Sequence, residues 1–461
     1  MQFKDILQYL PEVRGPVEKR LAFNTKLKWT FLVLVAFFVL AGIPLYGLSR
    51  NSLERFQFLE IILGTEFGSI ISLGIGPIVM ASIILQLLVG SKILNIDTKT
   101  EEGKKYFQGL QKLLVFFFIL FEASVYVLMQ GLQALPGYTP IVIFQMVLGG
   151  LLIVFMDEVV TKWGFGSGVS LFIVAGVGKG LFTALFQFIG TEGGICLFNF
   201  GQVPCAGKFW VVIQSIINSD PTGALRALTA ILVTALIFLV AIWAQSLKVE
   251  IPLSFDRLRG YSMKWPLAFF YASNIPVILT SALVANLQLF AGLFENWLGK
   301  PTLLGSFQGG IPVSGLAYWL SAPQLLEALI TKSFTSSMIL QALTNTFFYV
   351  TFSIIFAIFW VKTAGMDAGS QAKNIISSGL QIPGFRKDER VLESILDRYI
   401  MPLTVMGGAA IGLLASAADL LGALTSGTAI LLAVMIIYQM YQHIAQQHAL
   451  DMHPVLKKMG G

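Results

Sequence analysis

Residues 72–91 read SLGIGPIVMASIILQLLVGS, a stretch of twenty residues without a charged side chain. A helix needs about 20 apolar residues to cross the hydrocarbon core of a bilayer, so this stretch is typical of a membrane span. Similar apolar blocks occur along the whole chain. They predict ten spans, with limits near 28–46, 70–91, 110–131, 138–157, 167–189, 225–247, 266–289, 336–361, 402–421 and 427–446. The expected fold class is an all-α polytopic membrane protein.

The composition excludes other classes of protein. Of 461 residues, 56% are hydrophobic and 12% are charged, whereas soluble proteins carry roughly 25% charged residues. A soluble enzyme, a disordered chain and a nucleic-acid-binding domain are excluded on this ground. The first twenty residues mix apolar and charged side chains instead of forming a cleavable signal peptide. We expect a short amphipathic helix on the inner leaflet here, with a solvated tail as the alternative.

The basic residues predict how the chain is oriented. With the N-terminus inside, 24 Lys and Arg residues fall in cytoplasmic segments and six in external ones. The positive-inside rule therefore places both termini in the cytoplasm, and the cell (plasma) membrane is the expected location. The net charge of +6 is first of all a signal of topology.

Five spans in each half imply that the two halves cross the membrane in opposite directions, as in an inverted repeat, although no clear sequence repeat accompanies them. The predicted organisation is an N-terminal segment 1–27, a first half 28–189, an external loop 190–224, a second half 225–446 and a cytoplasmic tail 447–461. Residues 50–67 carry five charges, and we expect them to fold back into a cavity. The cytoplasmic loops 248–264 and 362–398 are read as solvated loops or as a basic docking surface.

Motifs of catalysis and metal binding are missing. The histidines at 443, 448 and 453 are five residues apart, which turns each about 140° from the last on a helix, so they share no face for a metal. HExxH, P-loop and GxSxG sequences are absent. We therefore expect no enzyme activity, no metal and no cofactor.

Ionisable residues within the spans are functional candidates, because burying a charge in lipid is costly. Glu122 lies in the middle of the third span and is expected to face protein or water. Lys179 and Asp419 lie toward the outer ends of their spans, where snorkelling toward the interface is the simpler explanation.

The seventh span contains Asn274, Asn286 and Pro276, and the proline is expected to kink the helix. The other inner spans are almost uniformly aliphatic. An aliphatic pathway offers no specific site for a solute, yet it allows varied side chains to pass while excluding water. This pattern slightly favours a conduit for polypeptide over an ion-coupled transporter.

Cys196 and Cys205 belong to the predicted external loop, where disulfides persist. The intervening Gly201 and Pro204 favour a turn that brings the sulfur atoms together. We predict a disulfide, with two unpaired buried thiols as the alternative. In the chain-entropy model such a bond is worth roughly 2–3 kcal/mol.

The sequence resembles the SecY family, the central subunit of protein-conducting channels, and is most similar to its archaeal type. The resemblance rests on residues 72–91 and on a collinear series of motifs: FQGLQKLL (107–114), MDEVVTKWGFGSGVSLFIVAGV (156–177), VEIPL (249–253), SNIPVI (273–278), PGFR (383–386), PLTVM (402–406) and GALTSGT (422–428). It implies a clamshell of two inverted five-helix halves with a short re-entrant plug helix at about 51–66.

The resemblance also implies functional positions. A pore ring would comprise Ile75, Val79, Val169, Ile173, Ile278 and Leu432. A lateral gate between spans two and three and spans seven and eight would contain the polar pair Glu122 and Asn286, while Met80 replaces a hydroxyl that relatives often carry. Ribosome docking would involve Arg257, Arg259, Arg386, Lys387 and Arg390, since basic loops bind the phosphates of RNA.

The expected function is a passive channel that translocates secretory polypeptides and inserts membrane helices laterally. The alternative is an ion-coupled secondary solute transporter. The partners implied by the resemblance are small membrane subunits of the SecE/gamma and beta types, the ribosome, signal sequences with their nascent chains, and the lipid bilayer.

Overall fold

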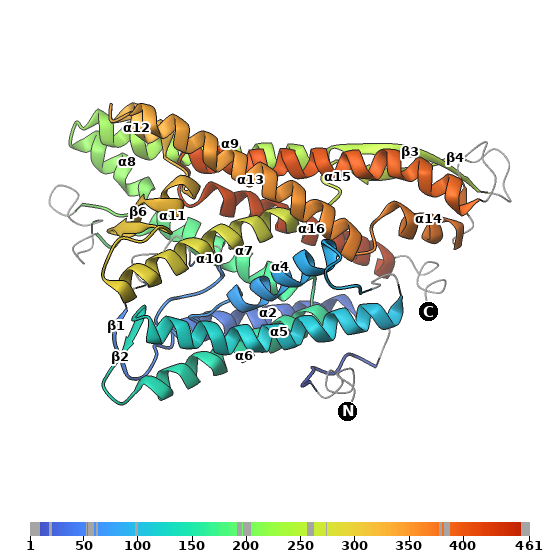
Figure 1. Ribbon diagram of the computed structural model, residues 1–461. Coiled ribbons are helices and arrows are strands. Elements are labelled where there is room, and N and C mark those ends of the chain that lie inside the picture. The colour runs from blue at the N-terminus through green and yellow to red at the C-terminus, as the bar shows by residue number, and fades with distance from the viewer. Residues whose placement is uncertain are drawn as a thin grey trace.

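The structure is a computed structural model of the 461-residue chain (Figure 1). It describes residues 10–17, 21–51, 53, 60, 63–96, 100–190, 196, 204–255, 262–272, 274–377, 380–381 and 388–452. The prediction of a polytopic helical protein is confirmed, because a helix occupies each of the ten predicted spans. These helices are α2 (Phe23–Ala41), α4 (Gly76–Gly90), α5 (Glu101–Leu128), α6 (Thr139–Trp163), α7 (Gly168–Phe186), α9 (Pro221–Ser246), α10 (Ile275–Leu298), α13 (Ser336–Thr363), α15 (Glu389–Leu420) and α16 (Gly427–Met452).

Among the described residues, nine of these helices are long and apolar enough to cross a bilayer. The exception is α4, whose 15 residues cover only about 22 Å at 1.5 Å per residue. The chain preceding α4 makes turns instead of a helix, and Gly74 adopts φ +52° there. A side chain at this glycine would approach the Leu63 carbonyl oxygen to 2.4 Å, so the close approach requires glycine.

The seventh span also begins later than predicted. Residues 262–268 form a strand, and α10 starts at Ile275. Pro276 is therefore in the first turn of α10, where it costs no hydrogen bond, and the predicted kink is wrong.

Short strands and helices connect the spans. The strands pair antiparallel as β1 (Leu48–Asn51) with β2 (Leu132–Ala134), β5 (Ser306–Gln308) with β6 (Ile311–Ser314), and β3 (Lys248–Phe255) with both β4 (Ser262–Ala268) and β7 (Leu380–Gln381). The short helices are α8 (Lys208–Ile217), α11 (Gly315–Leu320), α12 (Leu325–Ile330) and α14 (Ala368–Ser377). The β3 sheet joins the two basic loops, so their described residues are not free of regular structure.

The spans form two groups of five, α2 to α7 and α9 to α16, which lie one above the other in Figure 1. Two sets of contacts join them: α4 packs on α10 and α13, and α16 packs on α7 and α2. In the second group, Gly408 and Gly412 of α15 let the backbone of α13 approach closely, and a side chain at Gly412 would reach the Tyr349 carbonyl oxygen at 2.7 Å. Small residues at such contacts are typical of membrane helix pairs.

Gly149 of α6 provides a test of this close-contact fold. A β-carbon there would lie 1.9 Å from the Ile70 carbonyl oxygen, whereas nothing lies within 4 Å of a β-carbon at the exposed Gly178 of α7. Gly149→Ala should destabilise the protein by about 1–3 kcal/mol, the usual cost of overpacking. Thermal unfolding in detergent measures the change, with Gly178→Ala as the control. Equal unfolding temperatures for both variants would contradict the α6 contact.

Candidate functional site

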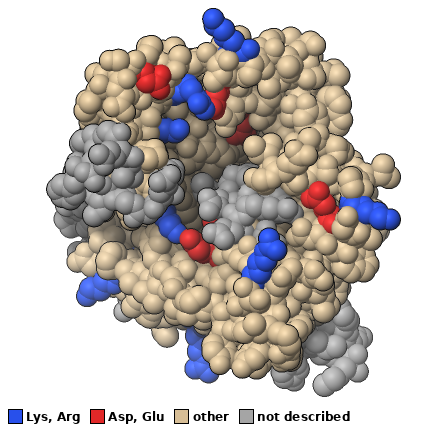
Figure 2. Space-filling view, turned by 90° about the vertical axis from the view of Figure 1, so that its left-hand side faces the viewer, with Lys and Arg blue, Asp and Glu red and all other residues tan. Residues whose placement is uncertain are grey.

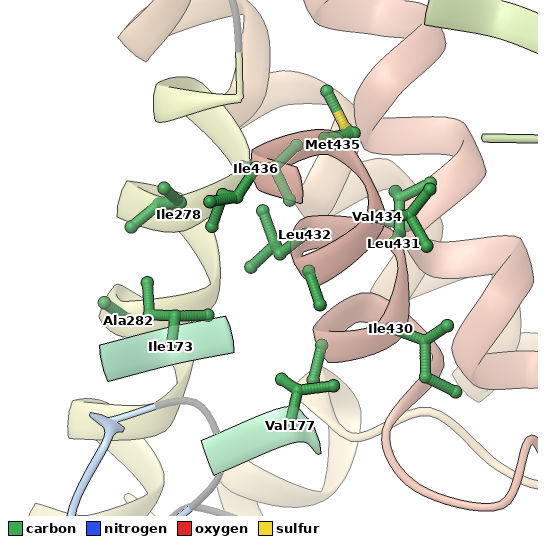
Figure 3. Close-up of a cluster of buried hydrophobic side chains, with 14 of the residues drawn as sticks. Ile173, Val177, Ile278, Ala282, Ile430, Leu431, Leu432, Val434, Met435 and Ile436 are labelled. Atoms are coloured by element: carbon green, nitrogen blue, oxygen red, sulfur yellow. The ribbon is translucent and has the colours of Figure 1, made fainter. Parts of the chain in front are cut away.

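A cluster of aliphatic side chains lies where the two helix groups meet. It contains all six predicted ring positions: Ile75 at the start of α4, Val79 of α4, Val169 and Ile173 of α7, Ile278 of α10 and Leu432 of α16. Val169 is partly buried and the other five are at most 8% exposed. Figure 3 shows Ile173, Ile278 and Leu432 converging from three helices. The structure thus brings together residues that are more than 350 positions apart in the sequence.

Helix α16 contributes most to this cluster. Residues 429–436 of α16 are buried on every side, as expected for a helix that is hydrophobic all round. Its neighbours come from both groups, since it contacts α9, α10 and α15 as well as α7 and α2. Leu432 is therefore enclosed at the centre of the molecule.

The molecule is hollowed on one side of this cluster. Figure 2 shows the end that carries α8 and β6, with a central depression and charged side chains around it. Of the predicted plug, residues 51–66, positions 52, 54–59 and 61–62 lie outside the described residues. Its described residues Leu53 and Leu63 are buried.

The end of the plug segment is attached directly to the ring. The Ile75 amide donates to the Leu63 carbonyl at 2.9 Å. The Thr65 hydroxyl contacts the carbonyl oxygens of Ile71 and Ser72 at 2.9 and 2.7 Å. Because these bonds involve backbone groups just before α4, they join the plug segment to the helix that supplies two ring positions.

Lys179 and Asp419 both have partners within the protein. The ammonium of Lys179 forms an ion pair with Glu66, the last residue of the predicted plug segment. Asp419 accepts hydrogen bonds from Ser426 and Thr428 at the start of α16. The snorkelling explanation is therefore wrong for Asp419, whose carboxylate is bonded within the protein, whereas the Lys179 side chain is half exposed and remains compatible with it.

Glu122 of α5 and Asn286 of α10 are both buried, and the residues next to them, Ala123 and Ala285, belong to one hydrophobic cluster. They are 0% and 2% exposed. A β-carbon at Gly76 would lie 3.1 Å from one Glu122 carboxylate oxygen, so the carboxylate lies against the start of α4. Within the described part of the chain, neither carboxylate oxygen has a hydrogen-bond partner. The Asn286 amide donates to the Ala282 carbonyl of its own helix at 2.8 Å, so no hydrogen bond joins the two residues.

The first described segment, residues 10–17, is held against the end of α6 by contacts that the sequence did not suggest. The Val13 amide donates to Glu158 at 2.7 Å, and the Trp163 indole donates to the Arg14 carbonyl at 2.9 Å. Lys162 pairs with Glu12 and holds the pKa of that carboxyl below its ordinary value. These residues are not helical, so the predicted amphipathic helix is wrong here, and prolines at 11 and 16 could have signalled this.

The structure joins Cys196 and Cys205 in a disulfide, with their Cα atoms 5.3 Å apart. The Cys205 amide donates to Gln214 of α8 at 3.0 Å, and the Cys196 amide donates to the Phe188 carbonyl beyond α7 at 3.0 Å. The disulfide therefore connects the end of α7 to α8.

Of the predicted ribosome-docking residues, Arg257, Arg259, Arg386 and Lys387 lie outside the described residues. Arg390 is exposed in the first turn of α15. The pairing of β3 with β7 fixes the bases of the two basic loops side by side. Within the described ranges, no group of three or more His, Cys, Asp or Glu side chains could hold a metal ion.

The fold and the site define a class: a polytopic helical membrane protein in which two five-helix groups enclose a cluster of buried aliphatic side chains. The chain belongs to the SecY family, whose sequence model matches residues 69–441. It is 44% identical to the protein translocase subunit SecY of Methanothermobacter thermautotrophicus, over 100% of this chain and 98% of that protein. The corresponding protein of Methanocaldococcus jannaschii is 40% identical, over 98% of both chains. These archaeal relatives confirm the resemblance to the archaeal type.

Solved structures agree with this assignment. A structure described as that of a protein-conducting channel superposes with a TM-score of 0.83 at 38% identity, covering 98% of this chain and 99% of the other. The channel in the canine ribosome–channel complex from the endoplasmic reticulum gives a TM-score of 0.80, also at 38% identity and with the same coverage. The predicted clamshell fold is confirmed.

The carboxylate oxygens of Glu122 and the amide oxygen of Asn286 lack partners among the described residues, and this gives the gate prediction its direction. An unsatisfied buried polar group costs about 1–3 kcal/mol, so both residues should disfavour the closed contact between α4 and α10. Replacing both with Leu should raise the yield of crosslinks between cysteines introduced on the facing sides of α4 and α10.

Gln245→Leu is the matched control, because the Gln245 amide nitrogen is also buried without a partner but lies on α9. Its removal should stabilise the fold and leave the crosslink yield unchanged. A lower crosslink yield in the double Leu variant would contradict this prediction and would mean that the two polar groups stabilise the closed gate.

Proposed function

We propose that this chain is the pore-forming subunit of a protein-conducting channel that translocates polypeptides and releases hydrophobic segments sideways into lipid. The observation that carries the proposal is the aliphatic cluster between the two helix groups, which collects side chains from α4, α7, α10 and α16. Aliphatic groups bind no particular solute, so such a constriction passes varied side chains. It excludes water and ions by dewetting when it is closed. An ion-coupled solute transporter would need a polar site at this position and is not favoured.

The plug segment is proposed to cover the seal. A related solved structure describes the plug domain of the SecY protein as stabilising the closed state of the translocation channel and maintaining a membrane seal. In this chain, the bonds of Leu63 and Thr65 to the residues before α4, and the ion pair of Glu66 with Lys179, support the same role. Opening requires these contacts to break.

The lateral exit is proposed to lie between α4 and α5 on one side and α10 and α13 on the other. The contacts of α4 with α10 and α13 close this exit. Buried polar side chains that lack partners at this contact lower its stability, which suits an interface that must part.

The orientation is proposed from charge. The end with the β3 sheet and the basic loops faces the cytoplasm, together with both termini, and the hollowed end of Figure 2 faces the exterior of the cell membrane. The disulfide then lies on the external side, where the environment permits it.

The proposed partners are the ribosome, nascent chains with their signal sequences, and small subunits of the SecE/gamma and beta types. The ribosome is supported by the similar canine channel, which was solved in a ribosome complex. The two basic loops, whose bases meet in the β3 sheet, are the proposed docking surface.

The proposed pore can be tested by making its aliphatic constriction polar, so that water enters it. Replacing Ile75, Ile278 and Leu432 together with Ser should raise the ion conductance of the channel in planar bilayers, since polar side chains retain water in a constriction. A triple Ser variant at the lipid-exposed positions Leu232, Leu236 and Leu239 of α9 is the control. Unchanged conductance in the folded ring variant would rule out this pore.

Charge reversal tests the docking surface. Changing Arg257 and Arg386 to Glu should weaken ribosome binding and flatten its dependence on salt, because fewer phosphate contacts release counterions. Lys208→Glu with Lys300→Glu changes the net charge equally at the opposite end and should leave binding unaltered. Sedimentation with ribosomes over a range of salt concentrations measures both quantities. The surface is wrongly assigned if the two double variants bind alike.

A further inference from the structure

Helix α16 lacks polar side chains over the part that forms the seal. Residues 429–437 are all apolar, and residues 429–436 are buried. Contacts between aliphatic surfaces have no preferred direction, so they fix the rotation and depth of a helix less precisely than hydrogen bonds do. The position of Leu432 in the ring must therefore depend on directional contacts elsewhere on α16.

Such contacts occur at the start of α16, on the side chain of Asp419. One carboxylate oxygen of Asp419 accepts from the Thr428 amide at 2.8 Å and from the Ser426 hydroxyl at 3.1 Å. The other oxygen accepts from the Thr428 hydroxyl, which also lies 3.2 Å from the Ala415 carbonyl oxygen. Since Asp419 and Ala415 belong to α15, these bonds fix the first turn of α16 to the end of the preceding helix.

Gly427 allows the start of α16 to lie close to the end of α15. A β-carbon at this position would lie 2.2 Å from the carbonyl carbon of Ala418, so only glycine allows α16 to begin this near to the backbone of α15. A further bond comes from α9, where the Thr234 hydroxyl accepts from the Leu424 amide at 3.0 Å. The turn between α15 and α16 is thereby held on two sides.

The geometry points to Asp419 as a positioning residue for the seal: by binding Thr428 it sets the rotation and depth of Leu432. Thr428 and Leu432 are four residues apart and so share one face of α16, about 6 Å apart along its axis. Thr428 is completely buried, which leaves its bonds shielded from water. The inference rests on the proposed role of Leu432 in the pore.

Asp419→Ala removes the acceptor for three donors and should raise the ion conductance of the closed channel several-fold in planar bilayers. Asp419→Asn should stay near the wild-type conductance. Its amide oxygen still accepts from the Thr428 amide and the Ser426 hydroxyl, and the Thr428 hydroxyl can accept from the new NH₂ while donating to Ala415. Asp419→Asn thus lacks the charge but keeps the hydrogen bonds, so its comparison with Asp419→Ala separates the effect of positioning from the effect of charge.

Ser416→Ala is the matched control for lost stability. Ser416 lies on the same helix and donates to Asn345 of α13 at 2.8 Å in a buried site, but no bond links it to α16. Thermal unfolding in detergent should show both Ala variants to be less stable than wild type, whereas only Asp419→Ala should leak. If Asp419→Ala does not fold, Gly427→Ala takes its place, because its β-carbon displaces α16 without removing a polar group.

Leu432→Gly reports on the pore itself and should leak. The positioning role is overturned if Leu432→Gly leaks while Asp419→Ala is as tight as Ser416→Ala. It is also overturned if Asp419→Asn leaks as much as Asp419→Ala, since the effect would then follow the charge. If Leu432→Gly is tight, the proposed seal is contradicted, and the role of Asp419 falls with it.

Discussion

Inside a bilayer, every backbone N–H and C=O group must find its hydrogen bond within the protein, because the hydrocarbon offers none. Helices satisfy this constraint along their length. Backbone groups at helix ends and in irregular segments need other solutions, and these shape the remaining structure. Four spans, α4, α6, α9 and α10, begin with proline in the first turn, where the missing N–H has no partner to lose. Irregular backbone around the plug segment is satisfied by bonds such as that from Ile75 to Leu63.

Buried polar side chains near the start of α16 and at the proposed gate differ in their hydrogen bonding. Between α11, α13, α15 and α16 several of them are paired: Ser416 donates to Asn345, Asn345 donates to the Leu320 carbonyl, and Asp419 accepts from Thr428. At the gate, the carboxylate of Glu122 has no partner among the described residues. Paired groups fix helices to one another, whereas unpaired ones weaken a contact. The start of α16 is thus held by hydrogen bonds, whereas an unpaired carboxylate lies at the contact where α4 and α10 are proposed to separate.

Different contacts hold the chain at the two ends of the molecule. At one end, the β3 sheet gathers two loops that are over a hundred residues apart and fixes the bases of the basic segments. At the other end, the disulfide and α8 connect α7 to α9, and the ion pair of Lys179 with Glu66 holds the end of the predicted plug segment. Directional contacts therefore restrain the chain at both ends, while the central cluster, the proposed pore, consists of aliphatic side chains.

Much of the fold could be predicted from sequence, because membrane spans are local features: a block of apolar residues such as 72–91 needs no distant partner to be recognised. The ring positions could be assigned only through the resemblance of motifs, since any aliphatic residue in such a chain looks alike by composition. The structure alone placed Pro276 at the start of α10 and brought the loops at 248–264 and 362–398 into one sheet. It alone showed that Lys179 and Asp419 are paired and that Glu122 is not. These features depend on contacts between residues distant in sequence, and hydropathy, which is a property of each residue and its neighbours, carries no information about them.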